Sequence, residues 1–132
     1  MLCDPVKQYL AEIENRLKNL LLTIDVSEDG FIRNILRIRV ARHCIIEIVE
    51  AAADGATIIL REFFNEKNFQ SYADIFQRLA KLGVISIKTR DSMIALTRLM
   101  NLIIHRYWNI DDIKIYHDAH GSGIESIRRF YS

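Results

Sequence analysis

Apolar residues recur every three or four positions along most of the chain, which is the period of an amphipathic α-helix. The first such run extends from Pro5 to about Ile24. Asp4 suits an N-cap, and Pro5 suits the first position of a helix. The polar stretch 25–30 that follows is expected to be a short connection. The pattern therefore predicts one amphipathic helix at the start of the chain.

A second and unusually long helix is expected to begin between Ser27 and Phe31 and to end near Phe64. Gly55 interrupts its apolar pattern. A glycine inside a helix costs only about 1 kcal/mol relative to alanine, so Gly55 is not expected to end the helix.

The middle of the chain predicts two further helices. Ser71 is a suitable N-cap for a short helix over 72–82, and Gly83 suits the C′ position after it. Ser86 then begins a helix that is expected to reach about Tyr107. Both helices have the apolar spacing of a surface that packs on a neighbour.

The last helix is expected after Asp111, which can cap it, and a kink or break is expected at the glycines of 121–123. Sustained alternation of apolar and polar residues, the pattern of a half-buried strand, does not occur. The sequence therefore predicts an all-α fold, an antiparallel bundle of about five helices, in a single domain spanning 1–132.

Composition adds little to the fold but limits the function. Half of the 132 residues are hydrophobic and the formal net charge is +1, so any nucleic-acid binding must come from a local patch. Cys3 and Cys44 are too few for a disulfide framework, and Cys44 is expected to be a buried thiol. Because no signal peptide or spanning segment is apparent, we expect a cytoplasmic protein that does not enter a membrane.

The segment 97–111 carries the candidate chemistry. Arg98 lies seven positions before His105, and Asn101 lies four before it, so the three side chains can share one helix face. Histidine can exchange a proton with a ribose hydroxyl or a leaving oxygen near neutral pH. Arginine can stabilise charge on a phosphate, and asparagine can orient either group. These residue types suit cleavage of a phosphodiester without a metal.

Two aromatic residues and a cation follow. Tyr107 and Trp108 can stack on unpaired bases, and Arg106 can contact the RNA backbone. The structural alternative is that His105 is an ordinary hydrogen-bonded histidine and that 106–108 is a helix end packing on a neighbour. Composition and periodicity leave both interpretations open.

The run from Asn101 to Trp108, followed by Ile110 and Asp111, resembles the signature of HepT-like proteins in the HEPN superfamily. That signature is an arginine, usually followed by asparagine, then a short apolar run, histidine, any residue and tyrosine. The resemblance extends over most of the chain. The segment 51–54 is similar to part of the family's second helix, and the segment 71–85 is similar to its short helix and turn.

The resemblance implies a homodimer in which the motif helices of two subunits line one composite cleft, and RNA cleavage without a metal or cofactor. It also implies the toxin role in a type II toxin–antitoxin pair whose antitoxin is a minimal nucleotidyltransferase. In some members the antitoxin transfers AMP to the motif tyrosine, which is Tyr107 here. An added nucleotide would bring negative charge and bulk to an RNA-binding cleft.

This sequence departs from the signature at one position. Met100 stands where the family has its arginine, and a methionine cannot neutralise a phosphate. Arg98 is rotated by about 200° from position 100 on an ideal helix. Either Arg98 or Arg106 replaces the missing arginine, or the enzyme is weak or inactive. The first hypothesis is an endoribonuclease that uses His105, Arg98 and Asn101; the alternative is an inactive dimer that only binds a nucleotidyltransferase.

The first half of the long helix is basic. Its arginines either form a groove for an RNA backbone or belong to a solvated face paired with nearby acids, and we favour the second. The arginines are Arg33, Arg37, Arg39 and Arg42, and the acids are Glu28, Asp29, Glu47 and Glu50.

Four other polar residues are less informative. Asp54 interrupts a run of small residues and either supports the dimer cleft or caps a kink near Gly55. His43 is expected to pack in or near the core. His117 and His120 are spaced like metal ligands on a helix, but nothing nearby completes a set, so we expect no metal site.

Overall fold

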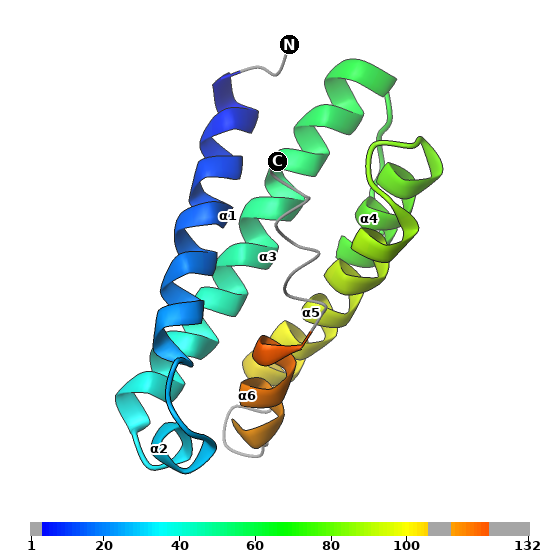
Figure 1. Ribbon diagram of the computed structural model, residues 1–132. Helices are drawn as coiled ribbons and strands as arrows, with labels where there is room; N and C mark the ends of the chain where they lie inside the picture. The colour runs from blue at the N-terminus through cyan, green and yellow to red at the C-terminus, as the bar shows by residue number, and fades with distance from the viewer. Residues whose placement is uncertain (1–3, 106–111, 122–132) are drawn as a thin grey trace.

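The computed structural model describes residues 4–105 and 112–121, and this part of the chain contains six helices and no strand (Figure 1). The predicted all-α fold is therefore confirmed. The helices are α1 (Asp4–Thr23), α2 (Glu28–Ile32), α3 (Ile35–Phe64), α4 (Tyr72–Lys81), α5 (Ile87–His105) and α6 (Asp112–His120). None of the described helices is long and apolar enough to span a lipid bilayer.

The predicted second helix is wrong at one point, because it is two helices. Ser27 caps α2, with its hydroxyl accepting from the backbone N–H of Gly30 at 3.0 Å. Asn34 then has extended backbone angles and its side-chain oxygen accepts from the N–H groups of Leu36 and Arg37. An asparagine in this conformation caps a new helix, so α3 begins at Ile35.

Gly55 does not end α3, as expected. A β-carbon at Gly55 would lie 3.3 Å from the β-carbon of Tyr9, which belongs to α1. The glycine is buried and allows the two long helices to pack closely at this point. Figure 1 shows α1 and α3 side by side along much of their length.

The caps of the α4–α5 hairpin also agree with the prediction. The Ser71 hydroxyl accepts from the N–H of Asp74, and Gly83 has φ +79°. The N–H of Val84 bonds to the carbonyl of Leu79, and that of Gly83 bonds to Ala80, which is the Schellman arrangement. Because the connection is short, α4 and α5 are antiparallel (Figure 1).

The apolar core joins α1, α3, α4 and α5, with α2 and α6 covering one end. Cys44 is buried in it, as expected, and burial raises the pKa of its thiol. The largest fully buried side chains are those of Ile13, Leu17, Leu20, Ile24, Phe31, Ile45, Ile48, Leu60, Phe76, Leu79, Met93 and Ile115. This core fixes which side of α5 faces solvent.

Candidate functional site

The three predicted catalytic side chains, those of Arg98, Asn101 and His105, are all exposed on α5. The residues between them include buried core positions, among them Met100, which is 4% exposed. The core therefore turns the candidate residues toward solvent and the position of the family arginine toward the interior. His105 is the last residue of α5 within the described chain.

Two of these side chains share a groove of about 400 Å³ between α4 and α5. Arg98 and Asn101 line it, while His105 does not. The lining residues are Ser71, Tyr72, Ala73 and Gln77 from the α4 side and Ile94, Thr97, Arg98, Met100 and Asn101 from α5. Its volume is within the range of about 300–1,000 Å³ typical of small-molecule pockets.

The polar groups of the groove differ in how far they are already engaged. The Thr97 hydroxyl donates to the carbonyl of Met93 at 2.7 Å, and the Ser71 hydroxyl accepts from Asp74. Within residues 4–105 and 112–121, no hydrogen bond or ion pair engages the side chains of Gln77, Arg98 and Asn101. These three side chains are therefore available to a ligand.

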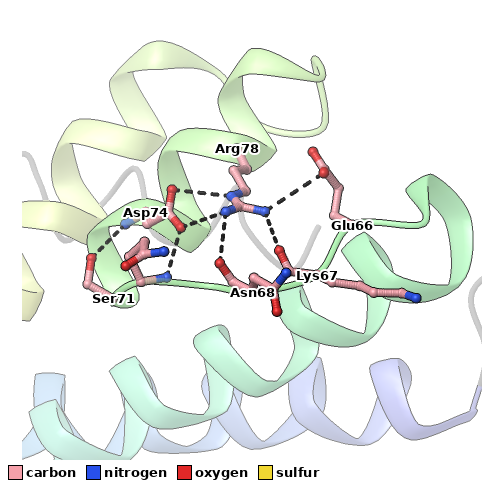
Figure 2. A network of polar contacts seen from close by, with 7 residues as sticks. Glu66, Lys67, Asn68, Ser71, Asp74 and Arg78 are labelled. Carbon is pink, nitrogen blue, oxygen red and sulfur yellow. Dashed lines mark hydrogen bonds and ion pairs between the residues drawn. The ribbon is translucent and has the colours of Figure 1, made fainter.

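Arg78 fixes the α4 wall of the groove (Figure 2). Its guanidinium donates to the carbonyls of Lys67 and Asn68 at 2.9 and 3.1 Å and to the Asp74 carboxylate at 3.2 Å. The Asp74 carboxylate also accepts from the N–H of Gln70 at 3.0 Å. This network holds the segment before α4 against the helix, and so it places the groove residues at the start of α4. Sequence reasoning missed Arg78, although its spacing from Asp74 is that of a helical ion pair.

The Asp74 carboxylate is stabilised in its charged form. The backbone N–H of Gln70, followed by the Arg78 guanidinium, holds the pKa of Asp74 below its ordinary value. The network therefore depends on an ionised Asp74, and it is weakened when that group takes up a proton.

Tyr72, on the α4 side of the groove, lies near negative charges. Burial raises the pKa of its phenol, and the carboxylates of Glu50 and Asp54 raise it further. Tyr72 is therefore neutral at physiological pH, with acidic residues near it, whereas Arg98 brings positive charge to the same groove. Sequence reasoning missed a role for Tyr72 in this groove, because it is the hairpin that brings Tyr72 beside α5.

Three of the four arginines predicted on the first half of the long helix make internal contacts, and within the described chain only Arg33, the C-cap of α2, pairs with an expected acid at the surface. Arg42 is buried and donates to Asp112 at 2.8 and 3.1 Å, so it ties α6 to α3. Arg33 pairs with Asp29 at 2.9 Å, and Arg37 donates to the carbonyl of Thr23 at 3.0 Å. Two of the partners thus differ from those expected.

Arg39 is the exception among these arginines. It is exposed and lines a second groove of about 270 Å³ between α3 and α5. The other lining residues are Arg42, His43, Ile46, Ile103 and Ile104. This groove lies beside the end of α5, and the alternative prediction for these arginines is a groove that binds an RNA backbone. Of the two arginines that line it, Arg39 is exposed and Arg42 is buried.

The predicted placement of His43 is wrong. Its side chain is 73% exposed and its Nε2 lies 2.8 Å from Glu47. Each helical residue advances by about 100°, so the buried neighbours Arg42 and Cys44 leave position 43 pointing outward.

The remaining polar residues lie at the surface. Asp54 is exposed and α3 continues through Gly55, so Asp54 caps no kink; its role in a dimer cleft stays a prediction. His117 lies 3.2 Å from Glu28, and His120 contacts the carbonyl of Tyr116 at 2.9 Å. No group of three or more histidines, cysteines or acids near enough to hold a metal occurs among the residues described.

Several predicted features lie outside the described residues. They are the site residues Arg106, Tyr107 and Trp108, the N-cap Asp111, and the helical segment after Gly121. Their roles stay predictions from the sequence.

Two solved structures share this fold. One is a toxin–antitoxin complex with AMP-PNP, with a TM-score of 0.87, 19% identity, and 98% of this chain and 96% of that chain covered. The other is a tri-AMPylated Shewanella oneidensis HEPN toxin in complex with an MNT antitoxin, with a TM-score of 0.86, 20% identity, and 98% and 95% covered. Among curated proteins, none matches the sequence. The family model for ribonuclease HepT-like proteins matches residues 6–131, and the chain therefore belongs to the HepT-like family.

Proposed function

We propose that this protein is the toxin of a type II toxin–antitoxin pair and acts as a homodimeric, metal-independent endoribonuclease. Membership of the HepT-like family supports the activity, and the complexes of the two similar structures support an antitoxin partner. The observation that carries the proposal is the exposure of Arg98, Asn101 and His105 on α5, with the first two unengaged within the described chain.

The chemistry follows from the residue types. The 2′-oxygen of a ribose attacks the adjacent phosphorus, and the bond from phosphorus to the 5′-oxygen of the next nucleotide breaks. The His105 imidazole takes the proton of the attacking hydroxyl or gives one to the leaving oxygen, and two protomers supply one imidazole for each task. Arg98 stabilises the charge that develops on the phosphate, and Asn101 orients it.

The segment after His105 completes the proposal. Arg106 and Trp108 contact the RNA, and Tyr107 is the residue that the antitoxin modifies. The Tyr107 hydroxyl attacks the α-phosphorus of ATP, AMP is transferred to the oxygen, and pyrophosphate leaves. The AMP then places negative charge where RNA would bind, which silences the toxin.

The test is cleavage of single-stranded RNA in EDTA by the wild type, by His105→Ala and by the control His117→Ala. Removing a general acid or base lowers a rate by about 10²- to 10⁴-fold. We expect that loss for His105→Ala only, since His117 is an exposed histidine on α6 that pairs with Glu28. Equal cleavage by the wild type and His105→Ala would remove His105 from the mechanism.

Met100 favours a second candidate function. A core residue stands where the family has its arginine. In this second candidate function, the protein is an inactive dimer that only binds a nucleotidyltransferase. This alternative predicts that purified wild-type protein leaves single-stranded RNA intact at every concentration tested, while it still binds the nucleotidyltransferase.

A further inference from the structure

The groove between α4 and α5 has features that cleavage by His105 does not require. We propose that it is a base-binding subsite for one nucleotide of single-stranded RNA. In this subsite Tyr72 stacks on the base, and the amide of Gln77 bonds to its edge. The inference rests on the proposed function, because it assumes that RNA lies along α5.

The lining of the groove matches the two surfaces of a nucleobase. Tyr72 offers an aromatic ring, and Ile94 and Met100 offer apolar contact, which together suit the flat faces of a base. The amide of Gln77 can both donate and accept, as a base edge requires. Because this amide is unengaged within the described residues, binding a base costs the protein no internal hydrogen bond.

The charges around the groove determine which end of the bound nucleotide lies near Tyr72 and which lies near Arg98. Glu50 and Asp54 act on the Tyr72 phenol, so a phosphate would be repelled there, whereas a base bearing amino groups would not. Arg98 brings the positive charge of the groove, and it lies on the same helix as His105. The base therefore occupies the Tyr72 side, and its phosphate lies toward Arg98 and the cleavage chemistry.

The subsite is formed before RNA arrives. Arg78 bonds to two backbone carbonyls of the loop and to Asp74, so the start of α4, which carries Tyr72, is held in place (Figure 2). A stacking residue on a fixed helix end loses little conformational freedom when it binds. Arg78 is thus a positioning residue, and Tyr72 and Gln77 are the specificity-determining residues.

The Gln77 amide also predicts a preferred base. A glutamine side chain pairs through two hydrogen bonds with the N6 and N7 atoms of adenine. We therefore expect adenine to bind more tightly than uracil in this groove.

The experiment measures RNA binding in the His105→Ala background, where the proposed mechanism no longer cuts the ligand. The probes are labelled uridine octamers that carry A, C, G or U at one central position, and anisotropy in EDTA gives the dissociation constants. Tyr72→Leu should weaken binding of the adenine probe about tenfold, which is within the range for loss of one stacked base. Tyr72→Phe retains the ring and should retain most of the affinity.

Gln77→Leu should remove the preference for adenine over uracil. Its matched control is Gln8→Leu, which changes an exposed glutamine on α1 and should keep the preference. The inference is overturned if Tyr72→Leu and Gln77→Leu bind all four probes as the parent does. It is also overturned if these changes break a homodimer in sedimentation while RNA affinity stays unchanged, because the groove would then be a protein contact.

The outcome separates this inference from the proposed function. If the wild type cleaves RNA through His105 but the groove variants bind the probes normally, only the subsite fails. If the wild type does not cleave RNA but adenine binding depends on Tyr72 and Gln77, only the ribonuclease activity fails.

Discussion

Arg42 and Arg98 are two arginines on helices that pack together, and the protein uses them differently. Arg42 is buried and its guanidinium is 2.8 Å from the Asp112 carboxylate, so this ion pair joins α6 to α3. Arg98 is exposed and no ion pair within the described residues engages it. An arginine that must bind a phosphate has to keep its donors free, and of these two arginines Arg98 satisfies this condition among the described residues.

The same contrast holds across the α5 helix itself. Both Arg98 and Met100 line the groove, but Arg98 is exposed to solvent, while Met100, two residues later, is 4% exposed and packs in the apolar core. Arg98 therefore places a cation on the exposed side of the helix that carries Met100. That Arg98 replaces the family arginine stays a prediction, and the difference in exposure makes it directly testable.

The largest expected effect is that of Arg98→Ala on cleavage. Removing one group that stabilises the transition state costs about 10²- to 10³-fold in rate. Because Arg98 is exposed and unengaged among the described residues, the free energy of unfolding should not change measurably. Arg33→Ala is the matched control, since Arg33 is also exposed but pairs with Asp29. The Arg33→Ala variant should cleave RNA normally. Undiminished cleavage by Arg98→Ala would contradict the comparison.

Met100→Arg tests whether position 100 can regain the family's residue. An arginine there would put an unpaired charge among apolar side chains, so we expect a loss of about 3 kcal/mol in the free energy of unfolding. Cleavage should not increase. Met100→Leu keeps the volume and should cost less than about 1.5 kcal/mol. Urea unfolding and the RNA assay measure both effects, and a large gain of cleavage in a stable Met100→Arg protein would favour the inactive alternative for the natural sequence.

Arg42 should respond in the opposite way to Arg98. Asp112→Ala leaves the buried guanidinium without its carboxylate, and we expect a loss of about 2 kcal/mol in the free energy of unfolding. In a double-mutant cycle with Arg42→Ala, the two losses should be non-additive, because both variants remove the same ion pair. Additive losses would mean that the pair does not hold α6 to α3.

Local chemistry explains which parts of the fold could be predicted. Ser71, Gly83 and Ser86 are read correctly, since a cap and the helix end that it satisfies are adjacent in the sequence. Asn34 has the same chemistry but lies inside the single long helix that the sequence predicts, because the apolar pattern continues on both sides of it. The break is supported by the bond from Arg37 to the carbonyl of Thr23, which no local pattern reveals.

The site shows the same limit. The spacing of Arg98, Asn101 and His105 on α5 could be predicted because it depends on one helix. The Arg42–Asp112 pair joins residues 70 positions apart, so only the packing of α6 on α3 reveals that Arg42 is structural. Tyr72 and Gln77 come beside α5 only through the hairpin, and their part in the groove therefore required the tertiary structure.

Arg78 provides the smallest and most specific test, because it is an engaged arginine like Arg42 but less buried, with a side chain that is 23% exposed. The pKa of Asp74 is lowered in the folded protein, so the ionised carboxylate stabilises the fold above its unfolded pKa of about 3.9. That contribution is lost as the pH falls through the folded pKa. Asp74→Asn should therefore cost about 1 kcal/mol at pH 7.

The difference between the wild type and Asp74→Asn should begin to shrink below about pH 4, because the unfolded chain then takes up a proton at Asp74. It should vanish below the lower folded pKa, where the carboxyl is neutral in both states. Urea unfolding at pH 7, 5 and 3 measures it. Asp91→Asn is the control, because Asp91 is exposed and its one ion-pair partner among residues 4–105 and 112–121 is its neighbour Arg90, so it should show no such dependence. A difference for Asp74→Asn that is the same at every pH would show that the carboxylate's charge does not hold Arg78 on the loop. The start of α4 would then need another support.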